Sequence, residues 1–196
     1  MEKLRNRLLE LLRRKSVQIG SFTLTSGQTS HYYLDSKHTT LHPEGACLSA
    51  RLILEELKRR NIRAEAIGGL TLGADPIVSA VAAVSFLQRE LYPPLHGFIV
   101  RKEPKKHGTQ RFIEGFEGGK GSPVVIVDDV CTTGNSALLA AQRAEAAGYR
   151  VVAVVCLVDR EQGGSERLRS YPFFSLLKAS EILDDATIQR RIAEQN

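Results

Sequence analysis

The sequence predicts an α/β fold in which a doubly wound, mainly parallel central sheet carries helices on both faces. Two runs, 123–127 and 151–158, are apolar at nearly every position, which is typical of strands that are buried on both faces. Helical patterns and glycine-containing turns lie between successive apolar runs. This alternation of strand and helix favours parallel pairing. The length of 196 residues is usual for one domain, so we expect a single domain over residues 1–196.

The N-terminal part, residues 1–42, is predicted to hold one helix and a small hood segment on the substrate side. Four leucines at helical spacing predict a surface helix over residues 2–15 that covers the core. Residues 22–27 and 31–35 are typical of short strands around a polar turn. A proline at a first helical position, with a glutamate in the first turn, predicts the next helix over residues 43–60.

The remaining elements alternate between strand and helix. Residues 68–73, Gly-Gly-Leu-Thr-Leu-Gly, are predicted to form a glycine turn between a strand and a helix. The stretch 101–118 is polar, rich in lysine and longer than an ordinary connection, so we expect a mobile functional loop. The predicted strands are 64–67, 97–100, 123–127, 151–158 and 173–177, and the predicted helices are 74–84, 135–147 and a polar terminal helix.

Composition and charge narrow the possible functions. Lysine and arginine number 27 against 22 acidic residues, and the formal charge of +5 favours anionic ligands, including small phosphorylated molecules. Aromatic residues make up 6% and tryptophan is absent, which argues against nucleic-acid binding. No apolar run approaches the roughly 18 residues of a spanning helix, so we expect a cytoplasmic protein. The three cysteines lack CxxC spacing, which indicates reduced thiols.

The strongest functional signal comes at the end of the apolar run 123–127. The run is followed by Asp128 and Asp129, and the segment 132–136, Thr-Thr-Gly-Asn-Ser, then opens the next helix. Backbone N–H groups at a helix N-terminus, with nearby hydroxyls, form a seat for phosphate. Two carboxylates beside such a seat suit a ribose 5-phosphate, whose hydroxyls they bind, or a divalent cation. In the alternative interpretation Asp129 only caps the loop. The sequence contains neither a Walker motif nor a dinucleotide fingerprint.

Together with three further segments that occur in the family's order, this motif makes the sequence resemble the type I phosphoribosyltransferases, and among them the orotate phosphoribosyltransferases. The apolar strand, the paired acids and the Thr/Gly-rich loop match that family's binding motif for 5-phosphoribosyl 1-diphosphate. Residues 100–108 match its mobile catalytic loop, 22–27 its N-terminal substrate segment, and 157–160 the late strand whose arginine meets the orotate carboxylate. The resemblance spans roughly residues 15–165 and implies the type I phosphoribosyltransferase fold.

The resemblance implies transfer of the 5-phosphoribosyl group from the sugar diphosphate to orotate, giving orotidine 5′-phosphate and diphosphate in de novo pyrimidine biosynthesis. It implies Mg²⁺ held mainly by substrate near the acid pair, and a homodimer that shares loop contacts across subunits. The implied catalytic residues are Lys105, His107, Asp128 and Asp129. The implied contacts with the sugar diphosphate are Arg101, Lys102, Lys105, His107, Asp128, Asp129, Val130, Cys131, Thr132, Thr133, Gly134, Asn135, Ser136, Thr71 and Leu72. Those with orotate are Thr132, Arg160, Thr25 and Tyr33.

Five positions depart from the family's pattern and leave alternatives open. Thr25 occupies a position where many members have lysine, and Thr71 and Leu72 replace an aromatic residue and a lysine. Tyr33 and Leu34 stand where two aromatic positions are common. Because these positions lie near the base, a phosphoribosyltransferase for a purine or another base is one alternative. A non-catalytic regulator that senses the sugar diphosphate or binds RNA is the other.

Two features favour orotate and catalysis over these alternatives. Arg160 suits a carboxylate, which a neutral purine lacks, although a surface ion pair with Asp159 or Glu161 is a simpler interpretation. The loop 101–118 carries cations that suit a departing diphosphate, which a sensor has no need to stabilise. Lysine-rich loops are often only solvated, and we interpret Lys106 in that way.

Overall fold

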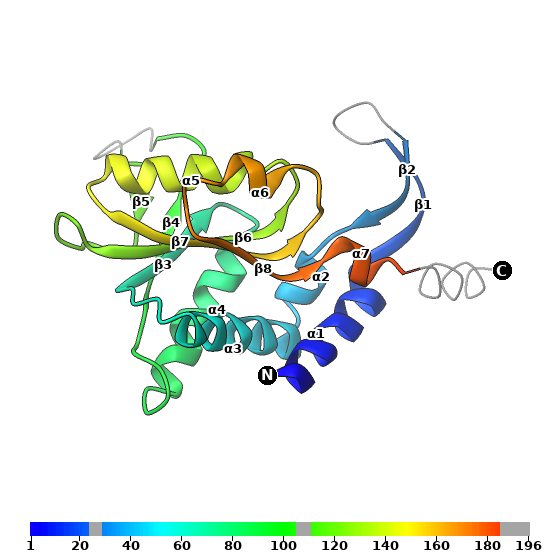
Figure 1. Ribbon diagram of the computed structural model, residues 1–196, viewed down its shortest axis with the longest axis horizontal. Coiled ribbons are helices and arrows are strands. Elements are labelled where there is room, and N and C mark those ends of the chain that lie inside the picture. Colours follow the sequence, from blue (N-terminus) through cyan, green and yellow to red (C-terminus); the bar gives the residue numbers. More distant parts are fainter. Residues whose placement is uncertain (24–28, 105–110, 185–196) are drawn as a thin grey trace.

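The structure is a computed structural model that describes residues 1–23, 29–104 and 111–184. Its main feature is a sheet of six strands with helices on both faces, which confirms the predicted fold class (Figure 1). Neighbouring strands are parallel except for β5, which pairs antiparallel with β4 at one edge. In spatial order the strands are β5 (Ile113–Glu114), β4 (His96–Val100), β3 (Ala66–Leu70), β6 (Pro123–Cys131), β7 (Arg150–Asp159) and β8 (Phe173–Lys178).

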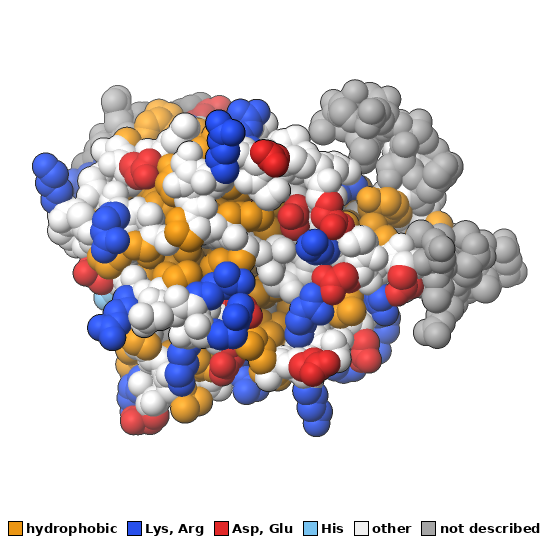
Figure 2. All heavy atoms as spheres, in the orientation of Figure 1, with side chains coloured by type: hydrophobic (Ala, Val, Ile, Leu, Met, Phe, Trp, Pro, Cys, Tyr) orange, Lys and Arg blue, Asp and Glu red, His pale blue; other side chains and the backbone are white. Residues whose placement is uncertain are grey.

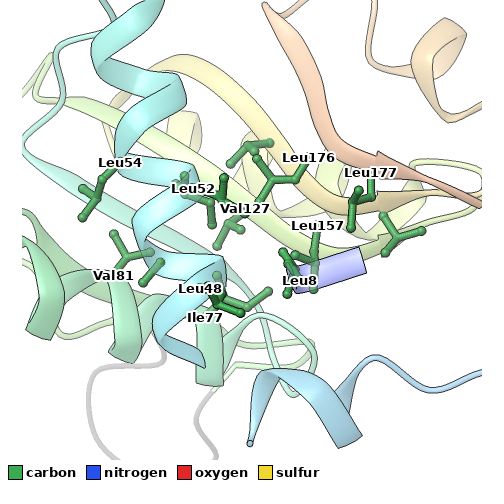
Figure 3. Close-up of a cluster of buried hydrophobic side chains, with 14 of the residues drawn as sticks. Leu8, Leu48, Leu52, Leu54, Ile77, Val81, Val127, Leu157, Leu176 and Leu177 are labelled. Atoms are coloured by element: carbon green, nitrogen blue, oxygen red, sulfur yellow. The ribbon is translucent and has the colours of Figure 1, made fainter. Parts of the chain in front are cut away.

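Helices cover both faces of the sheet and give the protein two cores (Figure 1). The larger core lies beneath α1, α3 and α4, and Figure 3 shows Leu52, Val127 and Leu157 meeting there. The smaller core packs alanines of α5 against the opposite face. The helices are α1 (Glu2–Lys15), α2 (Lys37–Thr40), α3 (Pro43–Arg59), α4 (Asp75–Leu87), α5 (Asn135–Ala146), α6 (Gly164–Arg167) and α7 (Ala179–Ile182).

The hood is an antiparallel pair of strands, β1 (Val17–Thr23) and β2 (Thr29–Leu34), which forms a sheet of its own. The prediction that the first strand begins at residue 22 was wrong, because β1 starts at Val17 and runs through Gly20. Val17 is buried and pairs with Leu34, so an apolar contact extends the ladder toward the core.

A short helix that was not predicted, α2, follows the hood. It is anchored to the end of α1 by a hydrogen bond of 2.7 Å between the buried hydroxyls of Ser16 and Thr39. The backbone N–H of Asp35 also donates to the carbonyl of Ser16 at 2.9 Å. These contacts fix the connection between β2 and α2 relative to the core.

The strand β3 is longer than predicted, because Gly68 and Gly69 belong to the strand and not to a turn. Both glycines pair in register with β4. A Cβ atom on Gly69 would lie 2.0 Å from the carbonyl oxygen of Val127, so the close approach of β3 and β6 requires glycine here. The turn is confined to the residues that follow Leu70.

The other differences from prediction concern short elements. The strand β5 lies inside the predicted loop 101–118, and α6 follows β7. Neither was predicted, because elements of two and four residues are too short to show periodicity. Residues 105–110 and 185–196 lie outside the described residues, and with them the centre of the predicted loop and the predicted terminal helix.

Charged side chains of both signs are interspersed over the face of the molecule that Figure 2 shows. On this face, among the described residues, the basic side chains are spread out, and apolar side chains lie between them. None of the helices in the three described ranges is long and apolar enough to cross a membrane.

Candidate active site

The two adjacent acids lie at the carboxyl edge of the sheet. Asp128 lies opposite Cys156 of β7 and is 6% exposed, and its Oδ1 accepts a hydrogen bond of 3.1 Å from the backbone N–H of Asp129. The Asp129 side chain is half-buried, and its Oδ2 accepts a hydrogen bond of 2.5 Å from the buried hydroxyl of Ser36. The segment that follows the hood therefore reaches the acid pair through Ser36, a contact that the sequence did not indicate.

Burial changes the acidity of one of the two carboxyl groups. Loss of hydration raises the pKa of Asp128 to about 7, and the charge of Asp129 adds to this effect. Near neutral pH the Asp128 carboxyl is therefore present in both its protonated and its ionised form. A carboxyl group in this condition can donate or accept a hydrogen bond, which suits a sugar hydroxyl.

The turn after β3 contacts the same acid pair. A Cβ atom on Gly73 would lie 2.4 Å from Oδ1 of Asp129, so the turn backbone touches this carboxylate directly. The N–H of Thr71 donates to the last carbonyl of β4 at 3.0 Å, and the Leu72 side chain is 77% exposed. Asp129 is therefore flanked by Gly73 at one carboxylate oxygen and by Ser36 at the other.

The loop between β6 and α5 has the form of a seat for an anion. Gly134 takes a φ of +78° directly before α5, a helix of 12 residues. The side chains of Thr133, Asn135 and Ser136 are exposed, whereas Cys131 is fully buried with its Sγ packed beneath α6. The N–H groups of the first turn of α5 and the exposed hydroxyls are the donors for an anion. Any contact of Cys131 with a ligand comes from its backbone.

Arg160 follows β7 and is positioned by the hood. Its backbone N–H donates to the carbonyl of Cys131 at 2.8 Å, which places it beside the loop that follows the acid pair. Its Nη2 donates to the hydroxyl of Tyr32 at 3.4 Å, and the guanidinium carbon lies 5.5 Å from the centre of that ring. Its Nε is buried without a hydrogen-bond partner in the described part of the chain. Glu161, one of the two acids considered as a surface partner of Arg160, pairs with Lys178 at 3.6 Å.

Tyr32, the neighbour of the predicted orotate-binding residue Tyr33, contacts Arg160. Tyr33 is 41% exposed, and its ring centre lies 5.6 Å from that of Phe22 on β1. Neighbouring side chains on a strand point to opposite faces, so only one of the two tyrosines can face Arg160. The sequence signal was the tyrosine pair itself, but the face that each residue occupies depends on the pairing of β1 with β2.

The ends of the loop 101–118 meet beside the turn that follows β3. A cavity of about 440 Å³ lies between them, and it brings together four residues that were predicted to bind the sugar diphosphate from two separate segments. Its lining comprises Thr71, Leu72, Ile99, Arg101, Lys102, Glu103 and Glu114. Arg101 pairs with Glu114 at 3.0 Å, and Lys102 is exposed. Lys105, His107 and Thr25 lie outside the described residues, so their roles stay predictions.

Arg143, on α5, holds both ends of this loop. Its guanidinium donates to the carbonyl of Arg101 and, at 2.9 Å, to that of Lys102. The same group stacks on the ring of Phe112, with 4.2 Å between the guanidinium carbon and the ring centre. No sequence pattern indicated this residue, because only the fold brings α5 beside the loop.

The acid pair offers part of a metal site. In the described ranges no group of three or more His, Cys, Asp or Glu side chains is arranged to hold a metal ion. Neighbouring carboxylate oxygens suit Mg²⁺, which commonly takes its other ligands from water and substrate phosphates. The residues present therefore fit a Mg²⁺ ion that a phosphorylated substrate holds near Asp128 and Asp129.

Comparison with known proteins agrees with this geometry. Residues 77–186 match the family described as the phosphoribosyl transferase domain. The chain is 48% identical over 170 residues to an orotate phosphoribosyltransferase of Synechocystis sp., a match that covers 87% of this chain and 83% of that relative. The chain belongs to the orotate phosphoribosyltransferase family.

Solved structures of the orotate phosphoribosyltransferase family share the fold. The orotate phosphoribosyltransferase of Mycobacterium tuberculosis in complex with Fe(III) dicitrate matches with a TM-score of 0.78 and 39% identity, over 91% of this chain and 98% of that one. The same enzyme in complex with 5-phospho-alpha-D-ribosyl 1-diphosphate matches with a TM-score of 0.74 and 34% identity, over the same shares of the two chains. The chain therefore has the type I phosphoribosyltransferase fold that was predicted.

Proposed function

We propose that the chain transfers the 5-phosphoribosyl group from 5-phosphoribosyl 1-diphosphate to orotate, giving orotidine 5′-phosphate and diphosphate in de novo pyrimidine biosynthesis. The observation that carries this proposal is the meeting of three elements at one sheet edge: the acid pair of β6, the N-terminus of α5 and the turn at Gly73. The names of the relatives support the reaction, and a neighbour in complex with the sugar diphosphate supports the donor substrate.

The ribose 5-phosphate end of the donor suits the acid pair and the loop that follows it. The N-terminus of α5 supplies N–H donors and the positive end of a helix dipole for the phosphate. The ribose hydroxyls suit the two carboxyl groups, of which Asp129 is the better acceptor because the raised pKa of Asp128 keeps that group partly protonated.

The diphosphate end suits the cavity beside the turn after β3. Breaking the anomeric C–O bond leaves negative charge on the diphosphate, so cationic groups there lower the barrier. Arg101 and Lys102 line this cavity, and Lys105 and His107 are proposed to join them from the centre of the loop. A Mg²⁺ ion, which Asp128 and Asp129 would help to hold, would add positive charge that stabilises the departing diphosphate.

Orotate suits the side of the site where Arg160 lies. The orotate carboxylate matches the guanidinium of Arg160. The Nε of Arg160 is buried and has no hydrogen-bond partner within the described ranges. A buried N–H donor without a partner is costly, and a carboxylate would supply that partner. Thr132, half-buried beside it, is the second residue proposed to hold orotate. A neutral purine brings no carboxylate to this position.

We also propose that the protein is a cytoplasmic homodimer in which loop contacts are shared between subunits. The exposed apolar side chains of Leu72 and Ile99 lie at the cavity beside Arg101, where a second subunit would cover them. Analytical ultracentrifugation should give twice the mass of 21.6 kDa, and a monomer at micromolar concentration contradicts the dimer.

Product analysis tests the reaction. The protein is incubated with orotate, 5-phosphoribosyl 1-diphosphate and Mg²⁺, and the mixture is separated by anion-exchange chromatography. We expect orotidine 5′-phosphate and inorganic diphosphate in equal amounts. Release of diphosphate without the nucleotide indicates hydrolysis instead of transfer, and that result contradicts the proposal.

Replacing Lys105 by alanine is expected to lower kcat by ~10²-fold, because one cation that stabilises the departing diphosphate is lost. Lys106→Ala is the matched control, since we interpret its side chain as solvated. Steady-state kinetics of both variants measure the effect. Equal kcat values for the two variants would remove Lys105 from the mechanism.

Replacing Arg143 by methionine is expected to lower kcat by about tenfold, because both ends of the loop 101–118 lose their anchor on α5. Arg89→Met, in the exposed turn after α4, is the control for loss of a surface guanidinium. Kinetics at saturating orotate measure kcat. A kcat unchanged from wild type would show that loop geometry does not depend on this residue.

A further inference from the structure

A lysine that no sequence motif indicated lies near the acid pair. Lys37 is the first residue of α2, and its Nζ lies 2.8 Å from Oδ1 of Asp35. The Lys37 side chain is 47% exposed, whereas that of Asp35 is 19% exposed. The same carboxylate oxygen accepts the backbone N–H of Lys37 at 3.0 Å, so the carboxylate is fixed while the ammonium lies toward solvent.

The backbone before Lys37 is tied to the acid pair. Ser36 is fully buried, and its hydroxyl donates to Oδ2 of Asp129 at 2.5 Å. The pKa of Lys37 is raised chiefly by its hydrogen bond with Asp35, and the charges of Asp129 and Tyr33 also raise it. The ammonium group therefore lies within the electrostatic reach of Asp129 and Tyr33.

Two separate segments of the chain contact the carboxylate of Asp129. Gly73, in the turn beside the diphosphate cavity, touches one oxygen of this carboxylate, and the segment 35–37 holds the other. Lys37, which follows Ser36 directly, therefore lies near the same carboxylate as the turn beside the diphosphate cavity.

The negative charge that gathers at the site creates a need for a further cation such as Lys37. Asp35, Asp128 and Asp129 already bring three carboxyl groups, and the donor substrate adds a monophosphate and a diphosphate. At the diphosphate cavity Lys102 is an exposed cation, but Arg101 is engaged by Glu114, and the turn residues Thr71 and Leu72 are uncharged. A lysine has a compact charge on a flexible stem of four carbons, so it can exchange one anionic partner for another without a change of backbone.

We propose that Lys37 binds the donor substrate, and that its ammonium group leaves Asp35 for the diphosphate when 5-phosphoribosyl 1-diphosphate enters the site. This inference rests on the proposed function, because that function supplies the ligand. Asp35 then acts as a resting partner that orients the lysine in the free protein. The segment 35–37 thus adds a mobile cation to the fixed donors of the turn and the helix N-terminus.

Substitution of Lys37 with a matched control tests this role. Binding of 5-phosphoribosyl 1-diphosphate with Mg²⁺ is measured by isothermal titration calorimetry on the full chain. Lys37→Gln should weaken binding about tenfold, and Lys37→Arg should restore most of it. Lys120→Gln, in an exposed turn at the opposite edge of the sheet, should bind as wild type does. Binding by Lys37→Gln within twofold of wild type overturns the proposal.

A second variant separates ligand binding from a structural ion pair. Asp35→Asn keeps the oxygen that accepts the backbone N–H of Lys37 and removes the charge that competes with substrate. We expect it to bind the sugar diphosphate at least as tightly as wild type. If Asp35→Asn and Lys37→Gln weaken binding equally, the pair is structural and the proposal fails. A wild-type protein that neither binds the sugar diphosphate nor converts orotate instead refutes the proposed function.

Discussion

Replacing Asp129 by asparagine is expected to lower kcat/KM for 5-phosphoribosyl 1-diphosphate by ~10²-fold or more. Asparagine keeps the shape of the side chain and one oxygen, so the contacts with Gly73 and Ser36 can persist and the fold should be retained. What the substitution removes is the negative charge that suits the ribose hydroxyls and a substrate-held Mg²⁺. Steady-state kinetics at varied concentrations of the sugar diphosphate, with matching calorimetric titrations, measure the loss.

Two further variants serve as references for the effect of Asp129→Asn. Glu90→Gln removes one carboxylate from an exposed turn remote from the sheet edge, and it should behave as wild type does. Ser36→Ala removes only the hydrogen bond to Asp129, so its loss should be smaller than that of Asp129→Asn. If Asp129→Asn binds the sugar diphosphate as wild type does, the acid pair is a structural feature of the loop.

Replacing Asp128 by asparagine is expected to lower activity and to raise stability. The pKa of Asp128 is raised to about 7 by burial and by Asp129, whereas an aspartate in the unfolded chain titrates near 4. Stability from this group is complete below the unfolded pKa and is lost as the pH rises toward the folded pKa, because the unfolded chain then ionises more readily. At pH 8 the variant should therefore exceed wild type by on the order of 2–4 kcal/mol in free energy of unfolding.

Urea denaturation of both proteins at pH 4.5 and pH 8 measures this effect. The difference between variant and wild type should be small at the lower pH and large at the higher one, while kcat of the variant is reduced at both. A difference that does not change with pH would mean that Asp128 is ionised throughout, as an exposed carboxyl group is. Such a pairing of lost activity with gained stability is expected where a buried acid is kept for function.

The fold class was predictable because its cause lies in local composition. Strands buried on both faces must be apolar at successive positions, and the runs at 123–127 and 151–158 satisfy this condition directly. The glycines at 68 and 69 misled the prediction, since glycine commonly marks turns. Here Gly69 is required by the approach of β3 to β6, and Gly68 lies against the ring of Phe98 on β4. The β3–β6 contact joins segments more than fifty residues apart, which no local pattern reveals.

Asp128 and Asp129 were predictable as site residues because they follow a strand and precede a helix in the sequence. The partners of these residues were not predictable. Ser36 reaches Asp129 across 93 positions, and Arg143 reaches the ends of a loop about forty positions earlier. The position of Tyr32 beside Arg160 likewise depends on the register of β1 and β2, which no property of the tyrosines themselves determines.

The identity of the acceptor base is tested most directly by a panel of bases. The protein is mixed with 5-phosphoribosyl 1-diphosphate and Mg²⁺ and with orotate, uracil, adenine, guanine or hypoxanthine in parallel, and the ultraviolet absorbance of each base is followed. We expect consumption of orotate alone, because only orotate brings a carboxylate to Arg160. Consumption of another base in preference to orotate would contradict the role of Arg160, and no consumption of any base would indicate a binding protein for the sugar diphosphate.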